Sequence, residues 1–435
     1  MASKCLEFHV KRCEAELVVP TKPTPNELKY LSDIDDQDFL RFQVHFIWYY
    51  RNSPSPLMEG KDPVKVIREA LGKALVFYYP LAGRLVEGYN RKLIVDCNGK
   101  GVLFIEADAD ISLHQLGDRI QPPCPFIDQV LYDVLGSDGI IDCPLLLIQV
   151  TRLTCGGFIL ALRINHTTCD AFGVFQFMNT LAEIAKGAQQ PSIPPVWERE
   201  LLFARNPPRV TCIHYEYQQQ QPLSIGQPNL DKTSSDIQCS FFFGPKQIRA
   251  IQKHLSSHLV SYSRYELLTA FSWRCQTLAL ELDPEDVVRV SIMVSARGKK
   301  YHGLHFPQGY YGNMFSFPAA VSKAGVLCEK PLAYAVDFMA IQGRPPYNAV
   351  RGNLIVSDTK NVHLDNVNFG WGLPLYGGLA KTFNGGSIHA KYRKNGEDGI
   401  LVLMSLPFLA MKRFQEEVAK VIGEDKPIIK ILSTL

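Results

Sequence analysis

The stretch LRINHTTCDAFGVFQFM, residues 162–178, places His166 and Asp170 four positions apart, where one hydrophobic periodicity gives way to another. A neutral imidazole takes a proton from a hydroxyl near neutral pH, so a histidine presented by a rigid element is a candidate general base. The same spacing also occurs at His114 and Asp118, in the polar stretch ADISLHQLGDRI. The spacing alone therefore identifies no base, and the surrounding elements must decide.

Those elements favour His166. The apolar runs PLLLIQVTRL (144–153) and FILALRINH (158–166) flank a Thr-Cys-Gly-Gly turn, which predicts an antiparallel hairpin that ends at the histidine. After Asp170 the period changes from two to about 3.6 residues, which predicts a helix with this aspartate as its N-cap. His114 has no apolar strand before it and is expected on a surface helix or loop. The alternative for His166 is a strand that simply ends on a polar residue.

The composition indicates a soluble globular enzyme or binding protein. The chain has 435 residues, which suggests two domains, with 46% hydrophobic and 20% charged residues. A net charge of +3 with no basic block argues against nucleic acid as a partner. No apolar run approaches the roughly 20 residues that span a bilayer, and the N-terminal segment lacks the apolar core of a signal peptide. We expect a cytoplasmic monomer that binds small molecules and no membrane.

The other chemical candidates are weaker. The 11 cysteines form no Cys-x-x-Cys pair and are typical of reduced thiols. Cys169 is too close to His166 in sequence for the usual separated Cys/His pair, and a buried thiol is favoured. His254 and His258 have a metal-like spacing, but no third ligand accompanies them, so a solvated helix face is favoured. No Gly-x-Gly-x-x-Gly or P-loop is present. We expect no metal and no tightly bound cofactor.

The chain divides at an irregular segment. Residues 188–236 are rich in Pro and Gln and lack hydrophobic periodicity, which predicts a linker between an N-terminal domain (1–187) and a C-terminal domain (237–435). In the second domain one helix is expected to open at Pro245, and another at a Ser263/Glu266 capping box.

Four segments together resemble a known family. HTTCDAFG (166–173) matches the His-x-x-x-Asp-x-x-Gly motif of the plant BAHD acyltransferases, which transfer acyl groups from coenzyme A to alcohols or amines. NFGWG (368–372) resembles that family's Asp-Phe-Gly-Trp-Gly motif, and YYPLAGRL (78–85) and GYYGN (309–313) resemble further family blocks. The matches occur in the expected order over essentially the whole chain. Within the family, the chain looks most similar to the benzyl alcohol benzoyltransferase and fruit alcohol acyltransferase group.

The resemblance implies an α/β fold of two chloramphenicol-acetyltransferase-like domains, each a mixed β-sheet with flanking helices, joined by a long crossover loop. It places His166 midway along a channel as the base, with acyl-CoA as co-substrate. It implies that Asp170 pairs with an arginine, for which Arg297 is the candidate, and this interpretation competes with the N-cap one. Trp371 Nε1 is a candidate donor to the oxyanion.

Further site residues follow from the same resemblance. Asn368 stands where most members have Asp, so an ion pair is excluded there, and Phe369, Gly370 and Gly372 complete a structural motif. The face formed by Val44, Phe46 and Trp48 in RFQVHFIWYY is expected to line the acceptor pocket, and the alternative is that these side chains belong to the core. The candidates for coenzyme A contacts are the basic residues of one helix start and two short segments: Lys246, Arg249, Lys253, Ser261, Tyr262, Ser263, Ser295, Ala296 and Arg297.

An apolar, aromatic acceptor face favours a small alcohol such as benzyl alcohol over a polyol, whose buried hydroxyls would be left unpaired at about 1–3 kcal/mol each. The donor suggested by the subgroup is benzoyl-CoA. Two alternatives stay open. One is transfer of acetyl or another acyl group to a bulkier alkaloid or terpenoid alcohol. The other is a catalytically silent protein that keeps the fold and binds a ligand.

Overall fold

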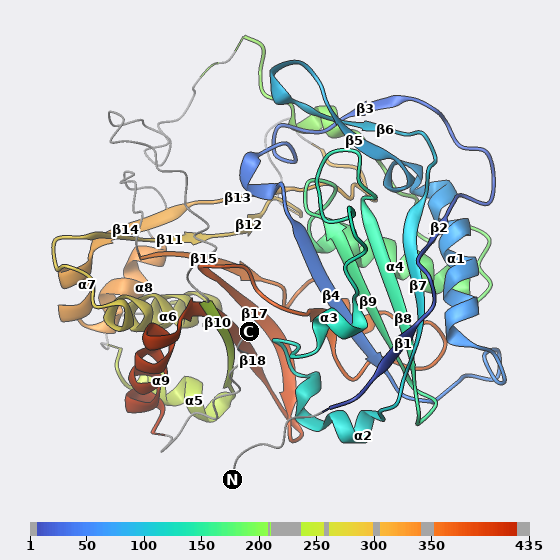
Figure 1. Ribbon diagram of the computed structural model, residues 1–435. Helices are drawn as coiled ribbons and strands as arrows, with labels where there is room; N and C mark the ends of the chain where they lie inside the picture. The colour runs from blue at the N-terminus through green and yellow to red at the C-terminus, as the bar shows by residue number, and fades with distance from the viewer. Residues whose placement is uncertain are drawn as a thin grey trace. The chain divides into compact units, whose positions relative to one another are not determined.

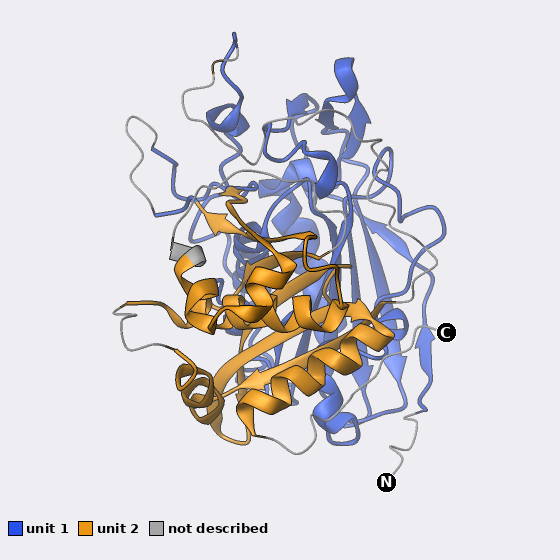
Figure 2. Ribbon diagram, turned by 90° about the vertical axis from the view of Figure 1, so that its left-hand side faces the viewer, with its two compact units in different colours: residues 1–208, 296–314, 362–380 blue, residues 209–295, 315–361, 381–435 orange. Residues whose placement is uncertain are grey.

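A computed structural model describes residues 7–207, 209, 236–255, 261–298, 305–340 and 352–423 (Figure 1). The chain forms two compact units, and neither is continuous in sequence (Figure 2). Unit 1 comprises residues 1–208, 296–314 and 362–380, and unit 2 comprises residues 209–295, 315–361 and 381–435. The expected division at 188–236 differs from this partition, because two segments after residue 295 return to the first unit. Most of the expected linker lies outside the described residues.

Unit 1 is built on a seven-stranded mixed sheet with the order β1-β7-β8-β9-β4-β16, and β2 also pairs with β7. The β7–β8 pair is parallel and the other pairs are antiparallel. The strands are β1 (Val10–Arg12), β2 (Glu16–Val18), β4 (Gln43–Tyr50), β7 (Val102–Ala109), β8 (Leu146–Leu153), β9 (Phe158–Asn165) and β16 (Gly377–Leu379). The antiparallel β8–β9 pair confirms the predicted hairpin.

Two long helices bury one face of this sheet. In α1 (Pro63–Phe77), Pro63 occupies N1 and the Asp62 side chain accepts from Val64 N at 3.2 Å. The second helix is α4 (Ala171–Ala185). Alternate β9 residues from Phe158 to Ile164 point into the core between the sheet and these helices, as the two-residue period requires. This core holds β9 rigidly, so the residue after its last position has a fixed place.

Shorter elements complete unit 1. A three-stranded sheet contains β3 (Leu28–Tyr30), β5 (Arg84–Glu87) and β6 (Leu93–Asp96). The short α-helices are α2 (Leu113–Leu116) and α3 (Ile127–Val130). Single 3₁₀ turns are η1 (Asp38–Leu40), η2 (Tyr79–Ala82), η3 (Tyr89–Arg91), η4 (Gly117–Ile120), η5 (Arg199–Leu202) and η7 (Leu364–Asn366).

Unit 2 has its own six-stranded mixed sheet, in the order β10-β18-β17-β15-β11-β14. The strands are β10 (Asp236–Phe243), β11 (Val287–Ile292), β14 (Ala319–Lys323), β15 (Asn353–Asp358), β17 (Gly386–Lys394) and β18 (Glu397–Pro407), and β12 (Val294–Ser295) pairs separately with β13 (Phe315–Ser316). The helices are α5 (Pro245–Gln252), α6 (Arg264–Leu280), α7 (Ala324–Glu329), α8 (Leu332–Ala340) and α9 (Phe408–Ile422). The predicted Ser263/Glu266 capping box opens α6.

Each unit therefore has a mixed sheet with helices packed on it, which confirms the predicted fold class. In the described part of the chain, no helix is both long enough and apolar enough to span a membrane.

Candidate active site

His166 follows the last residue of β9, and a tight turn fixes it there. Its backbone N–H donates to Phe42 O at 2.9 Å, which continues the pairing of β4 with β9. Asn165 closes the turn, because its Oδ1 accepts from the backbone N–H and the hydroxyl of Thr167 at 3.1 and 2.8 Å. The Thr168 hydroxyl donates to Asn165 O at 2.7 Å. The turn thus uses its own side chains to hold the imidazole at the strand end.

Asp170 makes both of the contacts that the sequence left in competition. Its Oδ1 accepts from Gly173 N at 3.1 Å and caps α4, while its Oδ2 accepts from Arg297 Nη1 and from Met314 N at 3.2 Å. Arg297 Nη2 also donates to Gly312 O at 2.7 Å. Asp170 therefore fastens the 297–314 segment to the start of α4, and one carboxylate serves as cap and ion-pair partner together.

The glycine of the motif is required by a close approach. A Cβ at Gly173 would lie 2.1 Å from Tyr311 O and 2.6 Å from Cys169 Cβ. Any larger residue would push the 309–313 segment away from α4. Gly173, the last residue of HTTCDAFG, thus allows two distant parts of unit 1 to pack closely.

Asn313, in the GYYGN segment, connects His166 to a buried carboxylate. Its side-chain Nδ2 donates to Asp35 Oδ1 and to His166 O, both at 2.8 Å, and its backbone N–H donates to Asp35 Oδ1 at 2.9 Å. The Asn313 side chain therefore ties the backbone at His166 to the buried Asp35 carboxylate.

Asp35 is held in turn by a buried arginine. Asp35 and Arg199 are both 0% exposed, with Arg199 Nε 3.5 Å from Asp35 Oδ2. Arg199 Nη2 donates to Thr168 O at 2.8 Å, so the guanidinium also supports the turn after His166. The rings that enclose the guanidinium at 4.4–5.2 Å belong to Trp197, Tyr310 and Tyr311. Asp35, Arg199 and Asn313 were not singled out from the sequence.

The environment keeps His166 neutral. Burial lowers the pKa of His166 below its ordinary value, and the nearby Asn313 side chain and the charges of Asp170 and Asp35 only partly oppose this. Nδ1 is buried, whereas the residue as a whole is partly accessible, so the accessible part lies away from Nδ1. The Phe42 ring lies 5.2 Å from the imidazole. The site offers a neutral imidazole with an apolar ring beside it.

The expected acceptor face is mostly core. Phe46 and Trp48 are 2% and 0% exposed, and both belong to the main hydrophobic cluster of unit 1. Trp48 Nε1 donates to Leu364 O at 2.9 Å, a bond that fixes the indole in place. Val44 is half-buried and packs against the same cluster. The three residues share one face, and for Phe46 and Trp48 that face packs in the hydrophobic core.

Trp371 lies near the start of β9, the strand that His166 follows. Its ring packs edge-to-face on Phe158, the first residue of β9, at 5.5 Å, whereas His166 follows the last residue. Seven steps along a strand span roughly 23 Å at about 3.3 Å per residue. An oxyanion donor must lie within about 3 Å of the reacting oxygen. The placement of Trp371 therefore does not fit the expected donor role.

The NFGWG segment is a packed turn. Asn368 Oδ1 accepts from Gly370 N at 2.8 Å, so the amide closes the turn without a charge. Gly370 and Gly372 have positive φ angles of 103° and 83°, and a Cβ at Gly370 would meet Met58 Cγ at 2.6 Å. Phe369 is fully buried and packs edge-to-face on Tyr50. The motif therefore stabilises unit 1, as its expected structural role requires.

The candidates for coenzyme A contacts are spread over both units. Lys246, Arg249 and Lys253 are exposed and lie three and four residues apart, on one face of α5 and its C-cap. Ser261 is exposed, Tyr262 OH accepts from Gln252 Nε2 at 3.3 Å, and the Ser263 hydroxyl caps α6. Ser295 ends β12 in unit 2, whereas Ala296 and Arg297 belong to unit 1. Arg297 is already paired with Asp170.

The alternative chemistries find no support in the described residues. Burial raises the pKa of Cys169 to about 12, so it is a thiol and not a thiolate near neutral pH. Among the described residues, no group of three His, Cys, Asp or Glu side chains is placed to hold a metal ion. His254 is exposed, and His258 lies outside the described residues.

Comparisons with known proteins identify the family. The model of the Transferase family matches residues 8–344. Alcohol acyl transferase 1 (allele RGb) from Malus domestica is 54% identical over 439 residues, covering 96% of each chain. Alcohol acyltransferase 16 from Actinidia chinensis var. chinensis is 52% identical over 459 residues, covering 99% of this chain and 98% of that protein.

Solved structures show the same fold at low sequence identity. Vinorine synthase superposes with a TM-score of 0.73 at 19% identity, covering 95% of this chain and 98% of that one. F. graminearum TRI101, in a complex with coenzyme A and deoxynivalenol, superposes with a TM-score of 0.67 at 15% identity, covering 89% of this chain and 96% of that one.

The class of protein is defined by a histidine at the end of a sheet strand, by the aspartate that caps the helix after it, and by a family match over most of the chain. The chain belongs to the Transferase family of BAHD acyltransferases, enzymes that use acyl-CoA as co-substrate. Within that family, the two relatives named above match nearly the full length of this chain and are plant alcohol acyltransferases.

Proposed function

We propose that the protein transfers a benzoyl group from benzoyl-CoA to a small alcohol such as benzyl alcohol, with His166 as general base and both substrates bound together. The observation that carries the mechanism is the placement of His166, whose Nδ1 is buried while the residue as a whole stays partly accessible. We therefore assign Nε2 as the nitrogen that receives the proton. The curated relatives, which are named alcohol acyltransferases, support an alcohol as the acceptor.

The reaction needs only one proton carrier. Nε2 takes the hydroxyl proton as the alcohol oxygen attacks the thioester carbonyl, and a bond forms between that oxygen and the acyl carbon. The carbon–sulfur bond then breaks, and the imidazolium returns the proton to the departing thiolate, giving an ester and free coenzyme A. A positioned base of this kind typically contributes about 10²–10⁴-fold. No acyl-enzyme is required, and the buried Cys169 thiol takes no part.

Asp170 acts in this proposal through position and charge. Its oxygens are engaged by Gly173, Arg297 and Met314, so it holds the turn and the 297–314 segment together. Its negative charge also opposes the lowering of the His166 pKa by burial. It is a positioning residue and not the orienting member of a triad.

The small aromatic substrates are supported by the surroundings of the base. The Phe42 ring lies beside the imidazole, and half-buried Val44 follows two residues later. An apolar neighbour of this kind favours an alcohol with few additional hydroxyls, because each extra buried hydroxyl without a partner costs about 1–3 kcal/mol. For coenzyme A, the exposed cations of α5 and its C-cap (Lys246, Arg249 and Lys253) are proposed contacts for phosphate groups.

A panel of CoA thioesters and alcohols tests the substrate assignment, with release of free CoA thiol and ester formation as the two readouts. We expect benzoyl-CoA with benzyl alcohol to give the highest kcat/KM. A higher kcat/KM for acetyl-CoA with a bulky terpenoid or alkaloid alcohol would overturn the choice of substrates while leaving the chemistry intact. Absence of CoA release with every acceptor would point instead to a ligand-binding protein without turnover.

A further inference from the structure

Asp35 and Arg199 form an ion pair that is fully buried in unit 1, next to the turn that carries His166. Both side chains are 0% exposed. Taking two charges out of water is costly, and their mutual attraction often only balances that cost, so a buried ion pair is weak evidence for a role in stability alone. The hydrogen bonds made by the pair point to a second role.

These hydrogen bonds reach two carbonyl groups of the turn. Arg199 Nη2 donates to Thr168 O at 2.8 Å. Asp35 Oδ1 accepts from Asn313 Nδ2 at 2.8 Å, and the same Nδ2 donates to His166 O at 2.8 Å. The two carbonyl oxygens are therefore held by donors from distant segments of the chain, and Asp35 joins those donors. A displacement of either donor must move the backbone from which the imidazole projects.

Asp35 is itself fixed by several partners. Its Oδ2 accepts from the backbone N–H and the hydroxyl of Ser32 at 3.2 and 2.7 Å, and its own backbone N–H donates to Ser32 Oγ at 3.0 Å. Its Oδ1 also accepts from the backbone N–H of Asn313 at 2.9 Å. Since both oxygens are engaged, the carboxylate is a fixed anchor for Arg199 on one side and for Asn313 on the other.

The guanidinium fits closely into its site. A Cβ at Gly312 would lie 1.2 Å from Arg199 Nη1, so the guanidinium occupies the space that any larger residue at position 312 would need. The rings of Trp197, Tyr310 and Tyr311 enclose it at 4.4–5.2 Å. A planar guanidinium packs between rings and donates from several nitrogens at once, which the point charge of a lysine does not. The site thus holds one donor in one place.

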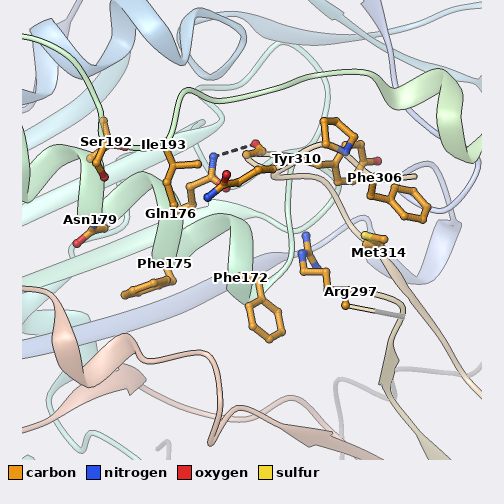
Figure 3. Close-up of a pocket in the computed structure, with 15 residues that line it drawn as sticks. Phe172, Phe175, Gln176, Asn179, Ser192, Ile193, Arg297, Phe306, Tyr310 and Met314 are labelled. Carbon is orange, nitrogen blue, oxygen red and sulfur yellow. Dashed lines mark hydrogen bonds between the residues drawn. The ribbon is translucent and has the colours of Figure 1, made fainter. Parts of the chain in front are cut away.

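The pair does not touch a substrate. Tyr310 and Gly309 help to line a cavity of about 280 Å³ in unit 1, and Gln176 Nε2 donates to Gly309 O at 2.9 Å in its wall (Figure 3). The described lining residues include neither Asp35 nor Arg199, and both of these side chains are closed to solvent. Any effect of the pair on turnover must therefore pass through the turn.

We propose that Arg199 and Asp35 are positioning residues for His166: they hold its turn so that the imidazole meets the substrate hydroxyl at a reactive distance and angle. This role rests on the proposed function, in which His166 is the general base. Its size follows from the sensitivity of catalysis to geometry, because a misplacement of about 1 Å costs on the order of 10²-fold in rate.

Arg163 provides a matched control, because it is a second buried arginine of unit 1 and lies in β9 shortly before His166. Its guanidinium is paired with Asp133 and donates to Ser137 O and Oγ at 2.9 and 2.6 Å. Arg163→Met and Arg199→Met each remove a buried arginine from an ion pair, so both should lower the midpoint of urea denaturation.

Steady-state kinetics with the best substrate pair separates the two variants. We expect Arg199→Met to lower kcat about 10–100-fold while changing both KM values less than about twofold, and Arg163→Met to keep kcat within about twofold. Comparable losses of kcat in the two variants would reduce the pair to a structural role and overturn the proposal. If Arg199→Met does not fold, Gly312→Ala keeps both charges and displaces the guanidinium, and should lower kcat in the same way.

NMR of ¹³C-labelled histidine measures the position of the imidazole without turnover. The His166 resonance is the one that disappears in His166→Ala. The Phe42 ring lies 5.2 Å from the imidazole, so the chemical shift of the neutral imidazole depends on how the two rings are placed. At a pH where His166 is neutral, we expect its resonance to move in Arg199→Met and to stay unchanged in Arg163→Met.

The two measurements together distinguish the inference from the proposed function. If the resonance moves in Arg199→Met but kcat is unchanged, the pair positions His166 and the proposed role of His166 as general base fails. If kcat falls while the resonance stays in place, the loss arises elsewhere and the inference is wrong. An unchanged resonance together with an unchanged kcat would also overturn it.

Discussion

Two histidines, one in each unit, lie in or directly after a strand, and their surroundings differ. His166 follows β9 in unit 1, remains partly accessible, and accepts from Asn313 Nδ2 through its backbone oxygen. His389 lies within β17 in unit 2 and is 0% exposed, and among the described residues neither of its ring nitrogens has a hydrogen-bond partner. The Tyr265 ring packs edge-on against it at 5.4 Å.

The difference teaches what distinguishes a base from a core residue. Burial lowers the pKa of both histidines. Around His166, the carboxylates of Asp170 and Asp35 oppose this effect, so the imidazolium that forms during turnover is partly stabilised. Around His389, the positive charge of the nearby Lys360 adds to the effect of burial, and the pKa of His389 falls to about 3. A lowered pKa alone therefore does not mark a catalytic histidine. Partial accessibility and compensating negative charge do.

The largest expected effect comes from removing the base. His166→Ala should reduce kcat/KM by about 10²–10⁴-fold while leaving the fold intact, because the substrate hydroxyl loses its proton acceptor. His114→Ala is the matched control: it alters the other His-x-x-x-Asp pair, whose histidine is exposed on α2, and should keep full activity. Steady-state kinetics with circular dichroism checks both variants. Comparable losses of kcat/KM in the two variants would contradict the role of His166 as the general base.

Removing the aspartate of each His-x-x-x-Asp pair tests whether Asp170 acts by positioning or by taking part in the reaction. Asp170→Ala leaves Arg297 without its carboxylate and uncaps α4, so we expect the free energy of unfolding to fall by about 3 kcal/mol. Asp118→Ala, at an exposed position, should change it by less than about 0.5 kcal/mol. Urea denaturation measures both. A stable Asp170→Ala variant that has lost all activity would contradict the positioning role and indicate direct participation.

The orienting partner should have a smaller effect with a distinctive pH signature. Asn313→Ala removes a side chain that raises the pKa of His166, so that pKa should fall further. Activity requires neutral His166 and is lost as the pH falls through this pKa, which lies below the ordinary value of about 6.5. The acid limb of the kcat/KM profile should therefore move to lower pH, with kcat reduced about tenfold by loss of orientation. A limb that moves to higher pH would contradict this account.

Much of the frame around His166 could be predicted from sequence because its signals are local. The β8–β9 hairpin, the Asp170 cap and the Ser263/Glu266 capping box each depend on residues a few positions apart. Local backbone chemistry determines these features wherever the segment lies in the fold.

The interactions that orient the base are non-local and escaped prediction. Asn313 bonds Asp35 across 278 positions, and no local pattern links those residues or predicts their joint burial with Arg199. The alternation in β4 correctly grouped Phe46 with Trp48, but alternation cannot say whether a face meets a pocket or the core. Trp371 shows the same limit, because nothing in the sequence told which end of β9 its turn would contact.

At pH 7 the smallest effect is expected at His389, and it would sharpen the comparison most. His389→Leu should leave kcat/KM unchanged and raise the free energy of unfolding at pH 7 by about 1 kcal/mol, because two buried nitrogens without partners are replaced by apolar atoms. The pH dependence has a definite sign. Between pH 6.5 and about 3 the unfolded chain binds a proton that the folded His389 does not, so this residue lowers stability by about 1.4 kcal/mol per pH unit as the pH falls. Urea denaturation over this range should show a shallower acid slope for His389→Leu than for the unaltered protein, with His114→Leu as the exposed control. Unchanged slopes would mean that His389 is not sealed in the core, and the contrast with His166 would then lose its basis.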